Sequence, residues 1–382
     1  MRTASAGAAV LLPSRDRHRP GGAGDLRGPG ARAACSGPSC ASHSGEGDDV
    51  ISVIVATHNR RALLERTVSA LAAQEHPRGD LEILVVDNAS TDGTAEAVEA
   101  LVRQAGGHAI RLLREARPGK SFAVNAGVSA AAGHLLAFTD DDVLPSPRWV
   151  AAIAKAMAES GADFCAGRIR PLWGAPPPAW LSPALHGVLA IPDNGPERLP
   201  IRRGLNEHVM PIGANMAVRR EVLDRLGGWR PELGKLRHTL RSGEDHEFFL
   251  RMLHAGLRGV YEPEAVVAHL VPADRLRRGY FLRWLHDNGL VVAGIERAYP
   301  PRVVSLLGVP RYLWREAASD ALRMVAAWGP DRAAERFARA NRLAWFAGYL
   351  RGAWSGAALA AALRPAAPPV RGTRTARVQE PR

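Results

Sequence analysis

Short apolar runs alternate with helix-like segments between residues 51 and 139, and this alternation constrains the fold more than any other feature of the chain. Runs with the apolar character of buried strands cover residues 51–56, 81–86, 109–114 and 134–139. Segments with helical spacing of apolar residues cover residues 61–74, 95–104 and 121–132. Strands and helices that alternate at this interval predict parallel βαβ units, and therefore an α/β fold with a mostly parallel central sheet and helices on both faces.

The pattern is less regular beyond the last of these strands. The elements it predicts are a helix over 149–157, a strand over 162–170, an irregular proline-rich loop over 171–200, an apolar segment over 210–218, a helix over 242–254, an extended segment over 261–270 and mainly helical sequence from 275 to about 354. We therefore predict a catalytic α/β domain over residues 50–270 and a helical extension over 271–360. Residues 1–49 and 361–382 lack apolar periodicity and are predicted to be a disordered leader and tail.

Polar side chains follow three of the predicted strands. Thr57 ends the first strand, Asp87 ends the second, and Asp140, Asp141 and Asp142 follow the apolar run that ends at residue 139. Ligands of open parallel sheets bind outside the carboxyl ends of the strands, so these side chains are expected at one edge. Adjacent carboxylates repel one another unless solvent or a cation screens them, and their oxygens suit Mg²⁺ or Mn²⁺. An acidic surface turn is the simpler reading of the triplet taken alone.

Charge and cysteine content limit the setting in which this chain works. The formal net charge is +12, and residues 270–382 hold 19 Arg and no Lys against 8 acidic residues, so nearly all of the basic surplus lies in the C-terminal third. Three cysteines cannot form a disulfide framework, which indicates a reducing cytoplasm. No uncharged run approaches the length of a membrane-spanning helix.

Four motifs, in this order, resemble glycosyltransferase family 2, an inverting family of nucleotide-sugar transferases with the GT-A fold. They are Val55-Ala56-Thr57-His58-Asn59-Arg60, Val86-Asp87-Asn88-Ala89-Ser90-Thr91-Asp92-Gly93-Thr94, Phe138-Thr139-Asp140-Asp141-Asp142 and Gly243-Glu244-Asp245-His246-Glu247-Phe248. The resemblance covers roughly residues 50–270. It implies the GT-A fold for this region and transfer of a sugar from a nucleotide-diphospho-sugar donor.

The resemblance also implies roles for individual residues in donor binding. Asp87 would accept a hydrogen bond from the base, typically the imide of uracil, although a turn-initiating aspartate explains the same residue. Lys120 would face phosphate oxygens, although a solvated surface lysine is an equal alternative. The full set of residues implied for nucleotide-sugar binding is Thr57, Asn59, Asp87, Lys120, Asn125, Asp140 and Asp141.

Metal binding and base catalysis are assigned by the same resemblance. Asp142 is expected to hold the divalent ion, Mn²⁺ or Mg²⁺, with Asp140 second and His269 as a further ligand. Asp141 has the weakest claim to direct coordination. Asp245 is expected to take the proton of the acceptor hydroxyl as it attacks the anomeric carbon, with helix capping as its structural alternative.

One departure narrows the predicted activity. Processive synthases of this family carry a Gln-x-x-Arg-Trp motif, and Tyr280 stands where the glutamine would be, ahead of Arg283 and Trp284. The prediction is therefore transfer of a single sugar from a UDP-linked donor to a lipid-linked or saccharide acceptor, in cell-surface polysaccharide or glycolipid synthesis. A non-catalytic nucleotide-sugar-binding relative and an aspartate-nucleophile phosphohydrolase are the alternatives. A dinucleotide-dependent oxidoreductase is excluded, because the turn after the first strand lacks glycine.

Arginines and aromatic residues are interleaved throughout the predicted extension. This composition suits amphipathic helices on an anionic membrane surface, and predicts a cytoplasmic enzyme that lies peripherally at the inner face of the cell membrane. The alternative is that the aromatic residues pack on the catalytic domain while the arginines are solvated. Nucleic-acid binding is not expected, because no recognisable module is present.

Overall fold

The protein is described here by a computed structural model. It describes residues 50–355 apart from 77–80, 105–108, 235–239, 241, 302 and 328. The predicted leader and tail, and the last five residues of the predicted extension, lie outside the described residues.

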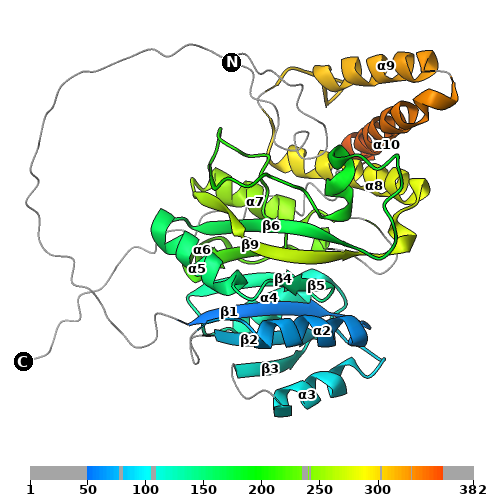
Figure 1. The fold of residues 1–382 in the computed structure, drawn as a ribbon. Coiled ribbons are helices and arrows are strands. Elements are labelled where there is room, and N and C mark those ends of the chain that lie inside the picture. Colours follow the sequence, from blue (N-terminus) through cyan, green and yellow to red (C-terminus); the bar gives the residue numbers. More distant parts are fainter. Residues whose placement is uncertain are drawn as a thin grey trace, which may run out of the picture.

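A mixed sheet forms the centre of the molecule (Figure 1). Its strand order is β3-β2-β1-β4-β8-β6-β9-β5, with β7 paired to β9. Strands β1 to β4 pair in parallel, as the βαβ pattern predicts, whereas β8 is antiparallel to both of its neighbours. The bounds are β1 (Ile51–Thr57), β2 (Leu81–Asp87), β3 (Ala109–Arg114), β4 (Leu135–Asp140), β5 (Val143–Pro145), β6 (Phe164–Trp173), β7 (Leu199–Ile201), β8 (Met216–Arg219) and β9 (Gly259–Val271).

Helices cover both faces of this sheet because successive residues of its strands point to opposite sides. On β1, Val53 and Val55 join the core beneath α2 and α5, whereas Ile54 joins the core beneath α4 and α7. The prediction of two covered faces is confirmed. The helices of this region are α2 (Arg61–Ala72), α3 (Thr94–Gln104), α4 (Lys120–Ala130), α5 (Trp149–Ser160), α6 (Arg220–Leu226) and α7 (Glu244–His254), with short 3-10 turns η1 (Pro183–Leu189) and η2 (Pro231–Leu233).

The proline-rich segment contains more regular structure than its sequence predicts. Strand β6 extends through Pro171 to Trp173, since it pairs with β9 along its whole length. The turn η1 and strand β7 follow before residue 202. Proline removes only its own amide donor. Pairing with β9 therefore continues past Pro171 and outweighs the tendency of a proline-rich sequence to form an irregular loop.

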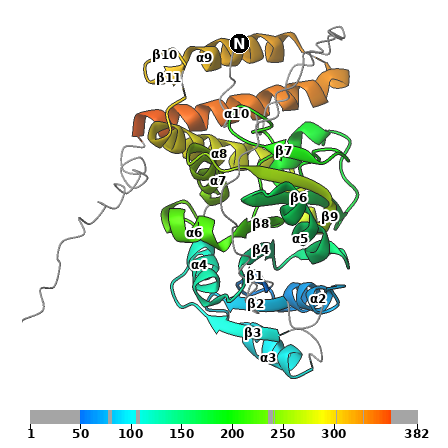
Figure 2. The same cartoon turned by 90° about the vertical axis from the view of Figure 1, so that its left-hand side faces the viewer.

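The extension is helical, as predicted, and two of its helices pack very closely. A methyl group on Gly348 of α10 would lie 1.8 Å from the carbonyl oxygen of His286 on α8, so only glycine allows this approach. Figure 2 shows α8 and α10 against the catalytic region and α9 along the outer edge. The elements are η3 (Ala273–Arg275), α8 (Arg278–Ala298), β10 (Ser305–Leu306), β11 (Val309–Pro310), α9 (Arg311–Ala326), η4 (Pro330–Arg332) and α10 (Ala333–Ser355).

Most aromatic residues of the extension face the protein interior. Trp345 and Tyr349 are buried in the same core as β1 and α5, and Phe281 and Phe337 stack edge-on against Trp180. The packing alternative raised by the sequence therefore describes these side chains. Among the described residues, no helix is both long enough and apolar enough to cross a membrane.

Candidate active site

The sheet brings the predicted polar strand ends to one edge. Thr57 pairs with Asp87 across β1 and β2, and Ala56 pairs with Asp140 across β1 and β4. These pairings place the ends of all three strands level with one another. The predicted convergence at the carboxyl edge is confirmed.

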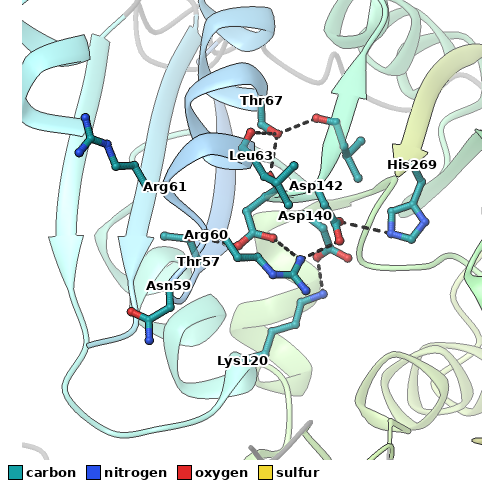
Figure 3. Close-up of polar contacts among 12 residues, drawn as sticks. Thr57, Asn59, Arg60, Arg61, Leu63, Thr67, Lys120, Asp140, Asp142 and His269 are labelled. Carbon is teal, nitrogen blue, oxygen red and sulfur yellow. Dashed lines mark hydrogen bonds and ion pairs between the residues drawn. The ribbon is translucent and has the colours of Figure 1, made fainter. Parts of the chain in front are cut away.

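Two carboxylates and a histidine form a group with the chemistry of a metal site. Asp140, Asp142 and His269 each offer one ligand atom, and these atoms lie within 4.8 Å of one another (Figure 3). The histidine Nε2 lies 3.3 Å from the Asp142 Oδ1. Strand β5 produces this proximity, because Val143 pairs with His269 directly after the triplet. Two hard oxygens and one imidazole nitrogen suit Mn²⁺ or Mg²⁺, so these residues fit the predicted ion.

Arg60 lies between two of the three aspartates. Its Nη1 donates to the Asp141 Oδ1 at 2.9 Å and to the Asp142 Oδ2 at 2.7 Å. Burial raises the pKa of Asp141 to about 6, although Arg60 opposes this shift. Burial alone would also raise the pKa of Asp142. His269 and Arg60 outweigh this effect and hold the pKa of that carboxyl below its ordinary value. Asp142 is therefore the more strongly anionic of the two, which suits the ligand role predicted for it.

Asp141 is occupied by the protein itself. Its Oδ2 accepts a hydrogen bond from the Thr57 hydroxyl at 2.8 Å, and its carbonyl oxygen accepts one from the Thr67 hydroxyl at 3.0 Å. Thr67, on α2, also donates to the carbonyl of Val143 at 2.8 Å. These bonds fix the backbone of the triplet, so Asp141 has a supporting place in the geometry.

Lys120 connects the acidic triplet with the predicted base. It begins α4, and its ammonium group forms an ion pair with Asp140 (Figure 3). Burial disfavours the charged form, but the carboxylates of Asp140, Asp245 and Glu244 outweigh it and raise the lysine pKa above its ordinary value. The side chain is therefore a fixed cation at the sheet edge rather than a solvated surface lysine.

Asp245 is held by two donors, one on each oxygen. The backbone N–H of Gly213 donates to Oδ2 at 2.9 Å, and the indole Nε1 of Trp229 donates to Oδ1 at 2.8 Å. Among the described residues, the donors to its side chain are Gly213 and Trp229, and neither belongs to α7. Each carboxylate oxygen keeps a further lone pair for an incoming hydroxyl. A methyl group on Gly213 would lie 3.1 Å from the Asp245 Oδ2, so glycine permits this close approach.

Asn125 acts on this site through Trp229. Its Nδ2 donates to the Trp229 carbonyl at 2.7 Å, and its Oδ1 accepts from the Trp229 N–H at 2.9 Å. Both ends of the amide are used in fixing the tryptophan that orients Asp245. The structure therefore places Asn125 behind the site, whereas the resemblance assigns it to the donor.

The other predicted residues belong to the turns beside the sheet edge. Asp87 is buried, and its Oδ1 accepts a hydrogen bond from the Ser90 N–H at 3.0 Å, as a turn-initiating aspartate would. Asn59 is exposed and its Oδ1 accepts from the Thr91 N–H at 2.7 Å, which ties the first two turns together. Asn59 points away from the acidic triplet (Figure 3).

Glu244 is a buried carboxyl beside the predicted base. Its Oε2 accepts a hydrogen bond from the Gly243 N–H at 2.9 Å. Burial, and then the charge of Asp245, raise its pKa to about 7 against the opposing charge of Lys120. It lies in the fourth motif without an assigned role there, and its proximity to Lys120 is a tertiary effect.

We expect Glu244→Gln to flatten the pH dependence of stability between about pH 5 and pH 7. A folded pKa above the unfolded value means that the folded chain holds a proton that the unfolded chain releases. The free energy of unfolding therefore falls as pH rises through this interval, by on the order of 2–3 kcal/mol. A glutamine is neutral throughout, so this fall disappears. Urea unfolding of both proteins across the interval measures it, and parallel curves would contradict the assignment.

His246 also contributes to the pH dependence of stability, and it is present in both the parent chain and the Glu244→Gln variant. Burial lowers the pKa of His246 to about 4, so its contribution rises with pH as that of Glu244 falls. The difference between the two unfolding curves, rather than either curve alone, isolates Glu244.

Three contributors to the site carry no assigned role in the sequence. Arg60 belongs to the first motif, and its half-buried side chain lies beside two of the three aspartates. Trp229 follows two glycines far from any motif, and Thr67 looks like an ordinary residue of the α2 core face. The last two depend on contacts between distant parts of the chain.

Comparison with known proteins is consistent with this geometry. The family model for glycosyl transferase family 2 matches residues 52–227. Glycosyltransferase AglE of Haloferax volcanii is 23% identical over 246 residues, which cover 62% of this chain and 75% of that protein. Pre-mycofactocin glycosyltransferase of Mycobacterium tuberculosis is 30% identical over 228 residues, which cover 59% of this chain and 44% of that protein. This chain therefore spans less than half of the second relative.

A solved structure shares the fold. The mannosyltransferase PcManGT from Pyrobaculum calidifontis, in complex with GDP-Man and Mn²⁺, aligns with a TM-score of 0.54 at 21% identity and covers 80% of this chain and 88% of that chain. The family model, the curated relatives and the mixed α/β sheet point to one assignment. Residues 52–227 form a glycosyltransferase family 2 domain with the GT-A fold.

Proposed function

We propose that this enzyme transfers a single sugar from a nucleotide-diphospho-sugar to an acceptor hydroxyl, with inversion at the anomeric carbon. The observation that carries the proposal is the placement of Lys120. Its ammonium group contacts Asp140 of the candidate metal group and faces Asp245 across a small pocket. The donor diphosphate needs a positive charge beside it, and the acceptor hydroxyl needs a negatively charged base. Lys120 and Asp245 supply these two charges at adjacent positions.

In the proposed mechanism, Asp245 takes the proton of the acceptor hydroxyl as its oxygen attacks the anomeric carbon. The bond from that carbon to the diphosphate breaks on the opposite face, which inverts the configuration. Gly213 and Trp229 keep the carboxylate in one orientation during the transfer. Lys120 places a positive charge near the phosphate oxygens of the departing group.

A divalent ion would be held by Asp142, Asp140 and His269. When bound, it supplies positive charge that neutralises the leaving diphosphate. The buried Nδ1 of His269 has no hydrogen-bond partner among the described residues. Among the described residues, the polar contact of this imidazole is with Asp142, which belongs to the same candidate metal group.

The donor and acceptor are proposed at the level of chemical class. A buried Asp87 at the end of β2 supports recognition of a base with an N–H donor, and uracil and guanine both carry one. PcManGT binds GDP-Man, so a GDP-sugar is a candidate beside the UDP-sugar that the motifs suggest. The acceptor is proposed to be a saccharide or lipid-linked hydroxyl of cell-surface polysaccharide or glycolipid synthesis.

A thermal-shift screen tests this proposal. The full chain is heated with UDP- and GDP-sugars, each with and without Mn²⁺. A bound donor at about a hundred times its Kd stabilises the folded state by about 3 kcal/mol, so one nucleotide class should raise Tm by several degrees only when Mn²⁺ is present. No response from the folded protein to any donor would contradict the proposal.

The two alternatives differ from the proposal in their expected products and in their use of the site. A non-catalytic nucleotide-sugar-binding relative would show the metal-dependent shift, but it would release no sugar when incubated with the bound donor. An aspartate-nucleophile phosphohydrolase would use Asp140 as the nucleophile, but it would give no function to the ordered Asp245 or to the buried Asp87. The glycosyltransferase proposal accounts for both.

A further inference from the structure

Large apolar side chains are exposed at the outer edge of the extension. Within the described parts of the chain, those left mostly open to solvent all lie between residues 304 and 354. Single exposed apolar residues are ordinary, but a set confined to one region of the fold marks an interaction surface. They are Val304, Leu306, Leu307, Leu322, Val325 and Trp354.

Three of these residues, Leu306, Leu307 and Trp354, lie together at the β10–β11 hairpin. The indole Nε1 of Trp354 donates to the carbonyl of Leu307 at 3.2 Å, and the indole of Trp314 donates to the carbonyl of Leu306 at the same distance. The two indole rings lie 6.4 Å apart. The end of α10 and the hairpin therefore present Leu307, 71% exposed, and Trp354, 61% exposed, side by side.

The outer face of α9 continues this exposed surface. Exposed residues recur every three or four positions along the helix, which places them on one side. The opposite side contains Asp320, which is buried and paired with Arg339 and Arg342 of α10. Figure 2 shows the hairpin at the start of α9, along the same edge of the molecule. The outer residues are Arg311, Arg315, Ala318, Leu322 and Val325.

We propose that the hairpin cluster and the outer face of α9 form a docking surface for an anionic lipid bilayer. Exposed aliphatic chains and an indole suit the boundary between headgroups and acyl chains. The exposed arginines Arg311, Arg315 and Arg351 suit anionic headgroups. The surface concerns where the enzyme works and does not depend on the proposed reaction.

Charge and composition favour a bilayer over the other possible occupants. A second copy of this chain would bring the same arginines against one another, and like charges at an interface oppose association. A nucleic acid would use the arginines but leave the exposed leucine and valine side chains in water. An anionic surface with an apolar interior accommodates both kinds of residue.

Vesicle co-sedimentation of the full chain tests this proposal. We expect binding to phosphatidylcholine vesicles containing about one-third phosphatidylglycerol, and at least tenfold weaker binding to phosphatidylcholine alone. Leu307→Asp and Leu322→Asp remove apolar contact at two separate positions, and Arg311→Gln with Arg315→Gln removes charge. Each change should weaken binding by on the order of tenfold.

Matched controls separate docking from general charge and from loss of fold. Arg66→Gln with Arg148→Gln removes two exposed arginines from the catalytic region and should leave binding unchanged. Circular dichroism and donor-induced thermal shift report whether each variant is folded. Equal binding of the parent and the hairpin and α9 variants would overturn the proposal. The proposal would also be overturned if the chain did not bind vesicles and light scattering showed a dimer that Leu322→Asp dissociates.

Discussion

Asp245→Asn is expected to lower kcat by about three orders of magnitude while leaving the Kd of the donor nearly unchanged. Loss of a general base removes a factor of about 10²–10⁴. The carboxamide keeps one acceptor oxygen, so it retains a hydrogen bond to Gly213 or Trp229 but not both. Single-turnover assays with saturating donor measure the chemical step, and titration calorimetry measures donor affinity.

The control for this variant is Asp224→Asn, an exposed carboxylate on α6. It should change neither kcat nor donor affinity. The lost hydrogen bond in Asp245→Asn should cost the fold only about 1–2 kcal/mol, which urea unfolding can verify. If Asp245→Asn kept near-normal kcat, another group would have to accept the proton and the proposed mechanism would fail.

Asp142→Asn should abolish Mn²⁺-dependent donor binding. The carboxylate is buried and its anionic form is favoured by His269 and Arg60, so its replacement removes an anionic ligand of the candidate metal group. We expect at least a hundredfold loss of metal affinity and a loss of about 10³ in kcat. Calorimetric titration of Mn²⁺ into the chain with bound nucleotide measures the first effect.

Asp141→Asn is the matched control, because it removes the same charge from the adjacent position. Asp141 bonds to Thr57 and Arg60 and is not part of the metal group. Its replacement should change metal affinity by less than about tenfold, since only the long-range charge is lost. Equal losses in the two variants would show that the triplet acts as a diffuse acidic patch rather than through Asp142.

The first half of the fold was predictable because its signals are local. Each strand from β1 to β4 is a mainly apolar run ending in a polar residue, and the register of parallel βαβ units then aligns Thr57, Asp87 and Asp140. The antiparallel insertion of β8 and the three-residue strand β5 were not predictable, because short strands have no periodicity of their own. Strand β8 forms by pairing with β4, and β5 forms by pairing with β9.

The same distinction applies to the site. Asp142 and Asp245 occupy motif positions, so the resemblance could assign them roles. Trp229 could not be found this way, because its function as a donor to Asp245 depends on Asn125, 104 positions earlier in the chain. The position of Glu244 near Lys120 likewise arises because the first residues of α4 and α7 line the same pocket. Local sequence predicts which groups carry chemistry, whereas tertiary contacts determine how they are oriented and charged.

The configuration of the released sugar tests the central claim most directly. Slow hydrolysis of the donor needs no identified acceptor, because water can occupy the place of the acceptor hydroxyl beside Asp245. Proton NMR of the anomeric signal, recorded before mutarotation, distinguishes the two products. Attack from the Asp245 side, opposite the diphosphate, predicts that an α-linked donor first yields the β sugar. First release of the α sugar would contradict the proposed placement of base and leaving group on opposite faces.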